Sequence, residues 1–125
     1  MEFDKRIPIY EQLKDHFKQA FAAGIYKLGE PLPSRRDIAQ IYQVNPNTVQ
    51  RAFKELEEEQ LIITGNNIPS RVTDDPQIIE NLQQKMIQTA VETFYQAAKP
   101  LNIEPERLVR YLTDYIEKQR GDDDA

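Results

Sequence analysis

The sequence contains no cysteine and a single histidine among its 125 residues. The absence of cysteine excludes disulfides, thiolate catalysis and cysteine-ligated zinc. His16 has no second histidine near it in the sequence, so we expect a surface residue rather than a metal ligand. We therefore predict a protein with no metal site and no cofactor.

Long hydrophobic runs are also absent. No apolar stretch approaches the roughly 20 residues that a membrane-spanning helix needs. The N-terminal residues, M-E-F-D-K-R, lack the apolar segment of a signal peptide. We expect no membrane partner and a cytoplasmic location, and the lack of cysteine fits a reducing compartment without establishing one.

Motifs of catalysis are missing as well. The sequence has no G-x-S-x-G nucleophile motif and no phosphate-binding loop, and its carboxylates fall on polar faces of the predicted helices. We predict that the protein is not an enzyme. A pocket that holds several titratable groups would be needed to revive a catalytic function.

The composition, with 39% hydrophobic and 30% charged residues, is typical of a soluble, helix-rich globular protein. The length of 125 residues predicts one domain, or one small domain with a short appendage. The formal net charge is -5, but it is unevenly distributed. Residues 1–72 hold 10 basic and 10 acidic side chains, whereas residues 73–125 hold 6 and 11. Residues 33–54 carry a local positive excess, which predicts modest non-specific affinity for phosphate.

Residues 34–56, S-R-R-D-I-A-Q-I-Y-Q-V-N-P-N-T-V-Q-R-A-F-K-E-L, predict two short amphipathic helices separated by a tight turn. The helices are expected over residues 35–42 and from 46 to about 59, with the turn at 43–44. The side chains expected to point inward are Ile38, Ala39, Ile41 or Tyr42, Val49, Ala52, Phe53 and Leu56. This arrangement is a helix-turn-helix, in which the second helix meets base edges.

Both predicted helices begin with strong capping signals. Ser34 is an N-cap with Asp37 in the capping-box position, and Asn45 caps the second helix ahead of Pro46. Arg35 and Arg36 oppose the dipole of the first helix, which favours a role in DNA binding over one in folding. The exposed stripe of the second helix is Asn47, Gln50, Arg51 and Lys54, and its acidic end, Glu55 and residues 57–59, is unsuited to phosphate.

A helix is also expected over residues 8–23, ended by Gly24, before an ordered loop at 25–33 that could include one short strand. The apolar stripe of this helix is Ile9, Leu13, Phe17, Ala20 and Phe21, and its predicted solvent-exposed face includes Lys14, Asp15 and Lys18. Ile25, Leu28 and Leu32 of the loop are expected to pack beneath the helix.

The β-branched run at residues 61–64, a turn at 65–67 and a returning strand at 71–73 predict a β-hairpin after the helix-turn-helix. Two further helices are expected over residues 77–98 and from 105 to about 119, followed by a frayed acidic end at 121–125. The sequence therefore predicts a mostly α fold with a small β-hairpin: an N-terminal winged helix-turn-helix domain over residues 1–74 and a C-terminal two-helix region over 75–125.

Four stretches in this order resemble the winged helix of the GntR family of bacterial transcription regulators: I-P-I-Y-E-Q-L (7–13), L-P-S-R-R-D-I-A (32–39), V-N-P-N-T-V-Q-R-A-F-K-E-L-E (44–57) and L-I (61–62). The likeness covers about residues 7–73. Because the tail is short, the chain resembles the YtrA-type subfamily, whose tail serves chiefly in dimerisation.

The resemblance implies roles for residues that match the family's motifs. Arg36 occupies the position of a base-contacting arginine, and Ser34 that of a phosphate contact. Asn45, Asn47 and Thr48 lie where the second helix of the motif touches bases and backbone. Together with the pattern above, the predicted DNA-binding residues are Ser34, Arg35, Arg36, Asn45, Asn47, Thr48, Gln50, Arg51, Lys54, Asn67 and Arg71.

The wing departs from the family pattern. T-G-N-N-I-P-S-R-V stands here, so Asn67 replaces a glycine and the tip lacks Lys and Arg. Asparagine tolerates the left-handed turn, but this tip should bind a minor groove less tightly. Gln43 likewise replaces a glycine that is common at the turn between the helices.

Two tail helices have little interior of their own, so their wide apolar faces predict contact with a second copy of the chain. The expected dimer-interface residues are Ile79, Leu82, Met86, Ala90, Phe94, Leu112 and Ile116. The resemblance implies a homodimeric regulator, more often a repressor, bound to double-stranded DNA at a two-fold symmetric operator. The alternative is a winged-helix protein-interaction module, and the sequence leaves a small-molecule effector unknown.

Overall fold

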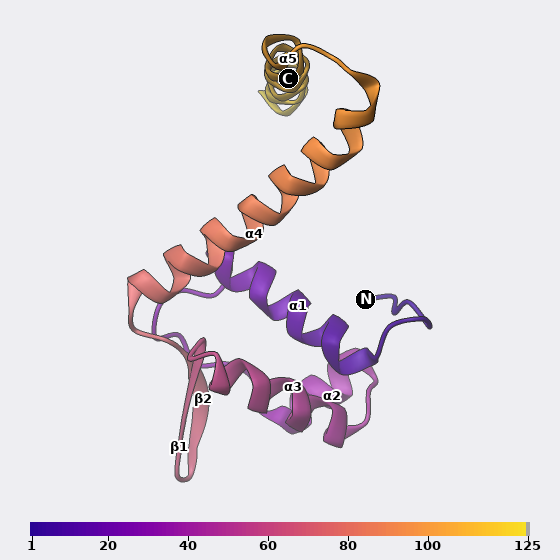
Figure 1. Cartoon of the computed structure of the whole chain (residues 1–125). Helices are drawn as coiled ribbons and strands as arrows, with labels where there is room; N and C mark the ends of the chain where they lie inside the picture. The colour runs from indigo at the N-terminus through magenta and orange to yellow at the C-terminus, as the bar shows by residue number, and fades with distance from the viewer. Residues whose placement is uncertain (125) are drawn as a thin grey trace. The chain divides into compact units, whose positions relative to one another are not determined.

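The computed structural model describes residues 1–124, which form two compact units, Met1–Lys85 and a second that begins at Met86. Figure 1 shows the helices and the one hairpin along the chain. The elements of the described residues are α1 (Ile9–Ala22), α2 (Arg35–Tyr42), α3 (Pro46–Glu58), β1 (Ile62–Gly65), β2 (Ile68–Val72), α4 (Pro76–Ala98), the short 3-10 helix η1 (Lys99–Leu101) and α5 (Pro105–Asp124). The predicted fold class, mostly α with a small β-hairpin, is confirmed.

The core of the first unit forms where the apolar faces of α1, α2 and α3 meet. Phe17 lies edge-on to Phe53 across the α1–α3 contact, with 5.8 Å between the ring centroids. Burial of each such ring contributes roughly 1.5–3 kcal/mol. The buried cluster is Leu13, Phe17, Phe21, Leu32, Ile38, Ala39, Val49, Ala52, Phe53, Leu56, Leu61, Ile62 and Val72. The inward positions predicted for α2 and α3 are therefore confirmed, with half-buried Tyr42 rather than Ile41 facing the core.

Three apolar side chains near α1 are more exposed than the sequence predicts. Ile9 is 43% exposed because it is the first residue of α1, at the end of the helix that lies outside the core. Ile25 and Leu28 are 71% and 47% exposed. The loop turns at Gly24 and Gly29, both with positive φ, and only Leu32 of its three predicted apolar contacts is buried.

His16 is not the surface residue that the sequence predicts. Its ring is half-buried, and Nε2 lies 3.0 Å from the hydroxyl of Tyr42. The ring also packs edge-on against Phe17 and Tyr42. Its position on the flank of the apolar stripe of α1 lets α2 cover it, so it joins the two helices.

The helix starts follow the predicted caps. Ser34 Oγ accepts a hydrogen bond from the backbone N–H of Asp37 at 3.0 Å, and Asn45 Oδ1 accepts one from that of Asn47 at 2.8 Å. Gln43 ends α2 in the left-handed conformation, with φ 53°. The turn therefore forms without the glycine that is common there.

The hairpin is an antiparallel pair in which Ile62 faces Val72, with a register shift between Ile63 and Gly65. Asn67 at its tip has φ 60°, the left-handed geometry expected of it. β2 begins at Ile68 and not at 71 as predicted, because a short strand tolerates Pro69 where no N–H is required. The stretch around Pro31 joins the other edge of β2, where Leu32 N–H donates to Ser70 O at 2.8 Å.

The first turns of α4 belong to the first unit. Ile78, Ile79 and Leu82 pack half-buried against its core, and the Gln83 side chain donates a hydrogen bond to the Ala22 carbonyl at 3.1 Å. The start of α4 is thus fixed against the end of α1.

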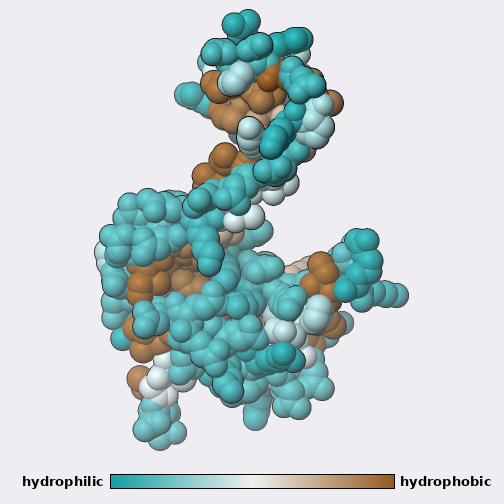
Figure 2. All heavy atoms as spheres, in the orientation of Figure 1, coloured by the Kyte–Doolittle hydropathy of each residue, from teal (hydrophilic) through white to brown (hydrophobic). Residues whose placement is uncertain are grey.

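The second unit contains the rest of α4, η1 and α5. The acidic residues up to Asp124 continue α5, so the predicted fraying of residues 121–124 is wrong, and residue 125 lies outside the described part. Gly121 does not adopt the positive φ with which a glycine would end the helix. Figure 2 shows apolar side chains gathered on the surface of the tail helices.

Candidate nucleic-acid interface

The start of α2 presents two arginines with different surroundings. Arg35 donates a hydrogen bond from Nη1 to Gln50 Oε1 on α3, and its guanidinium carbon lies 5.5 Å from the ring centroid of Phe53. Arg36 is exposed and makes no hydrogen bond or ion pair with any residue in 1–124. Arg35 therefore joins the two helices of the motif, whereas Arg36 is available to a ligand.

The outer face of α3 is polar along its first three turns. Asn47, Gln50, Arg51 and Lys54 are exposed, and Thr48 is half-buried. The four exposed side chains lie opposite the buried stripe of the same helix and line an open groove together with Glu55 and Glu58. Within the described chain, Lys54 has no hydrogen-bond or ion-pair partner. The exposed stripe predicted for α3 is therefore where the sequence places it.

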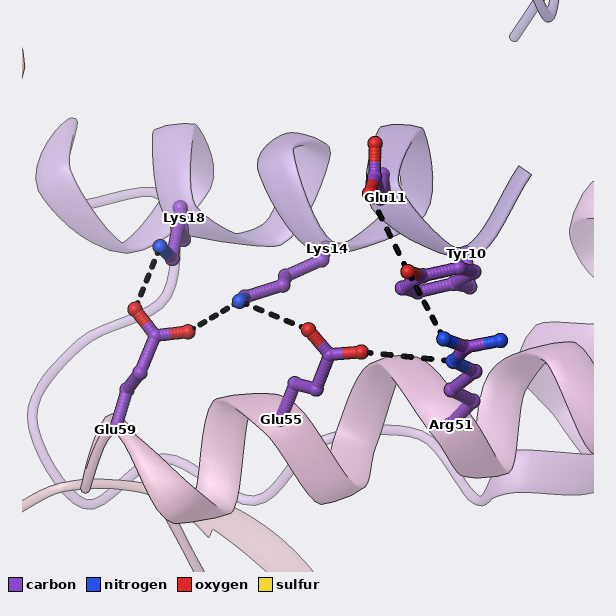
Figure 3. A network of polar contacts seen from close by, with 7 residues as sticks. All are labelled: Tyr10, Glu11, Lys14, Lys18, Arg51, Glu55 and Glu59. Atoms are coloured by element: carbon purple, nitrogen blue, oxygen red, sulfur yellow. Dashed lines mark hydrogen bonds and ion pairs between the residues drawn. The ribbon is translucent and has the colours of Figure 1, made fainter. Parts of the chain in front are cut away.

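A chain of ion pairs joins α1 to the outer side of α3 (Figure 3). Lys14 Nζ lies 3.2 Å from Glu55 and 2.5 Å from Glu59, and Lys18 Nζ lies 2.7 Å from Glu59. The prediction that Lys14 and Lys18 face water is wrong, because the two helices pack with these lysines over the acidic end of α3. Two acidic side chains at the end of α3, Glu55 and the C-cap residue Glu59, are thereby neutralised.

Proton affinities within this network follow from burial and charge pairing. Burial opposes the charged form of Glu59, but hydrogen bonds from Lys14 and Lys18 outweigh it and lower the Glu59 pKa. Burial also opposes the charged form of Lys14, and its bonds to Glu59 and Glu55 outweigh that effect and raise the Lys14 pKa. Lys14 and Glu59 therefore both stay charged at neutral pH.

Arg51 is held in place by Tyr10, which is not among the DNA-binding residues predicted from the sequence. Its guanidinium carbon lies 3.8 Å from the centroid of the Tyr10 ring, and Nη2 donates a hydrogen bond to the Tyr10 hydroxyl at 3.0 Å. Arg51 Nε is 3.7 Å from Glu55. Tyr10 lies within the I-P-I-Y-E-Q-L stretch, and this motif was the only sequence signal for it.

The wing carries its two predicted contacts on different parts of the hairpin. Asn67 is exposed at the tip, and Arg71 pairs with Asp74 at 2.6 Å. Thr64 and Ser70 hydroxyls, 2.9 Å apart, join the strands between them. Among residues 1–124, no hydrogen bond or ion pair links Asn67 or Arg71 to the starts of α2 and α3.

The predicted dimer residues divide between the two units. Ile79 and Leu82 are half-buried against the core of their own unit. The others lie in the second unit, where Met86 is half-buried and Ala90, Phe94, Leu112 and Ile116 are exposed. Packing within one chain explains why Ile79 and Leu82 are apolar. It does not explain the apolar side chains at the exposed positions of the second unit.

The described residues contain neither a metal-binding cluster nor a membrane-spanning helix. No group of three or more His, Asp or Glu side chains in 1–124 is placed to hold a metal ion. No helix in that range is long and apolar enough to cross a membrane.

The three-helix core, the helix-turn-helix and the hairpin define a winged-helix DNA-binding protein. The family model described as "Bacterial regulatory proteins, gntR family" matches residues 9–72, and the chain belongs to that family. It is a DNA-binding transcription regulator and not an enzyme.

Similar proteins cover nearly the whole chain. The HTH-type transcriptional repressor YtrA of Bacillus subtilis is 32% identical over 91% of this chain and 88% of its own length. The uncharacterized HTH-type transcriptional regulator YhcF of the same organism is 27% identical over 93% and 96%. A solved GntR family transcriptional regulator from Listeria monocytogenes has a TM-score of 0.84 and 32% identity, covering 90% of this chain and 98% of that one.

Proposed function

We propose that the protein represses transcription as a homodimer bound to a two-fold symmetric operator. The observation that carries the DNA contact is the exposed Arg36, without a partner in residues 1–124, at a helix start joined to the polar face of α3 by the Arg35–Gln50 bond. An exposed arginine can donate two hydrogen bonds to a guanine in the major groove.

In this proposal the start of α3 enters the major groove. Arg36 and the side chains of Asn45, Asn47 and Thr48 contact base edges, and Ser34, Arg51 and Lys54 contact phosphates. Asn45 and Ser34 can serve as caps and as contacts, since each cap uses one lone pair of the side-chain oxygen. Gln50 and Arg35 contact the DNA as a hydrogen-bonded pair. Asn67 and Arg71 of the wing add weaker contacts to the DNA backbone.

The division of labour proposed is DNA binding by residues 1–74 and dimerisation by residues 75–125. The exposed apolar side chains of the second unit support contact with a second copy of the chain, because exposed apolar surface of this extent usually marks a protein–protein interface. The repressor role is supported by the name of the YtrA relative from Bacillus subtilis.

Selection of bound sequences from a random duplex pool tests the proposal. We expect an enriched motif with two inverted half-sites whose centres lie about one helical turn apart. The affinity for the selected duplex should fall steeply with salt, because phosphate contacts release counterions.

The alternative is a winged-helix module that binds another protein. The weakly basic wing and the net charge of -5 favour it. It would be preferred if no duplex were enriched and none bound more tightly than competitor DNA at low salt.

A further inference from the structure

Tyr10, at the second residue of α1, contacts Arg51 of α3 with both its ring and its hydroxyl (Figure 3). The guanidinium carbon lies 3.8 Å from the ring centroid, and the hydroxyl accepts a hydrogen bond from Nη2 at 3.0 Å. The two residues are 41 positions apart in the sequence. An exposed arginine otherwise samples many rotamers, so two contacts with one rigid ring restrict it strongly.

The remaining contact of Arg51 is a loose one. Glu55 lies 3.7 Å from Nε, while Lys14 lies closer to the same carboxylate group, at 3.2 Å. The Glu55 carboxylate therefore lies closer to Lys14 of α1 than to Arg51. The third guanidinium nitrogen, Nη1, has no partner in the described residues and points away from the other two contacts in Figure 3.

We propose that Tyr10 is a positioning residue of the DNA interface, which fixes Arg51 so that Nη1 donates to a DNA phosphate. The inference rests on the proposed function. Stacking on the ring uses the face of the guanidinium, so the in-plane N–H groups of Nη1 stay free for an anionic oxygen. The start of α1 thereby joins the starts of α2 and α3 as a third contributor to the interface.

A purely structural role for Tyr10 has to be separated from this one. The side chain is half-buried and packs against the core cluster, so its removal can lower stability by itself. Tyr10→Phe keeps the ring and removes the hydroxyl, whereas Tyr10→Leu removes the stacking as well. Thermal melting of each variant shows that the fold is retained at the temperature of the binding assay.

The test measures the dissociation constant for the selected duplex over a range of salt concentrations. We expect Arg51→Ala to weaken binding roughly tenfold and to reduce the salt slope by about one. Tyr10→Leu should weaken it roughly threefold to fivefold, and Tyr10→Phe by less. The double variant Tyr10→Leu/Arg51→Ala should bind no more weakly than Arg51→Ala, because Tyr10 acts through Arg51.

A matched control is available in the second unit. Arg107 Nη2 donates to the Tyr111 hydroxyl at 3.1 Å, so Tyr111→Phe removes the same kind of bond on α5. It should leave the affinity and the salt slope unchanged, and an effect equal to that of Tyr10→Phe would overturn the proposal.

Three further results would overturn it. Losses that multiply in the double variant would show that Tyr10 acts independently of Arg51. Wild-type affinity in both Tyr10 variants, or in Arg51→Ala, would refute the positioning role while leaving the proposed function standing. A wild-type protein that binds no duplex specifically would refute both.

Discussion

At the scale of single residues, two neighbouring arginines differ in what surrounds them. Arg35 turns toward α3, where it meets Gln50 and the ring of Phe53, and Arg36 turns to solvent. The order S-R-R gives both side chains the same local environment, a capped helix start that repels positive charge. The two arginines differ because α3 packs beside Arg35 and not beside Arg36.

Arg36→Lys tests whether this residue reads a base. Lysine keeps the charge but loses the paired donors, so we expect specific affinity to fall by about 1–3 kcal/mol while the salt slope is retained. Competition gel shifts with the selected duplex and a scrambled duplex measure both quantities. Equal affinity of the variant and the wild type for the selected duplex would remove Arg36 from the base contacts.

At the scale of elements, the seam between α1 and α3 combines an aromatic core with a charged rim. Phe17 and Phe53 pack in its interior. At its solvent edge, Lys14 pairs with Glu55 and Glu59, and Lys18 pairs with Glu59. The lysine stems cover apolar surface while their ammonium groups reach the carboxylates. This seam sets the position of α3 relative to α1 and thereby the place of Arg51.

Glu59→Gln should destabilise the protein in a pH-dependent way. The Glu59 pKa is lowered in the folded chain, so its contribution is present above its unfolded value, about 4.3, and is lost as pH falls through the folded value. We expect the variant to melt below the wild type at pH 7 and the difference to shrink at lower pH.

Glu57→Gln is the matched control for this measurement, because Glu57 is exposed on the same helix and has no ion pair in the described chain. It should melt within a degree or so of the wild type at every pH, since exposed charges without partners contribute little. A deficit of Glu59→Gln that stays constant between pH 7 and acid would contradict the charge pairing.

At the scale of the whole molecule, the second unit leaves many large apolar side chains exposed, because two helices alone have little interior in which to bury them. Val91, Phe94, Tyr95, Val109 and Leu112 line a hollow between α4 and α5. No other chain is needed to explain the first unit, whose core is closed by its own elements. Dimerisation through the tail would place two DNA-binding units on one operator and roughly double the number of phosphate contacts.

Phe94→Asp tests the proposed dimer. A charge at the centre of an apolar interface leaves an unpaired ion when buried, so we expect a monomer in sedimentation velocity at micromolar concentration. Affinity for the full operator should fall toward that for a single half-site. Gln96→Asp, an exposed position that does not line the hollow, serves as the control and should remain a dimer with unchanged helix content.

Much of the fold follows from the sequence because local signals agree with one another. Ser34, Asn45 and Pro46 set the helix starts, and Val49, Ala52, Phe53 and Leu56 recur at helical spacing on the face that is buried. The sequence does not predict the β2 start at Ile68, because proline is a weak strand former. It does not predict the continued helix beyond Gly121 either, because glycine and aspartate are typical of helix ends.

The order of the elements, the buried face of each helix in the motif and the family can all be predicted from local sequence patterns. The pairing of polar side chains across helices cannot, because it depends on the folded arrangement. Tyr10 meets Arg51 and Lys14 meets Glu55 across 41 residues, and Arg35 meets Gln50 across 15. Such pairs depend on where two helices cross and how they are rotated about their axes, which is set by the packing of the core between them.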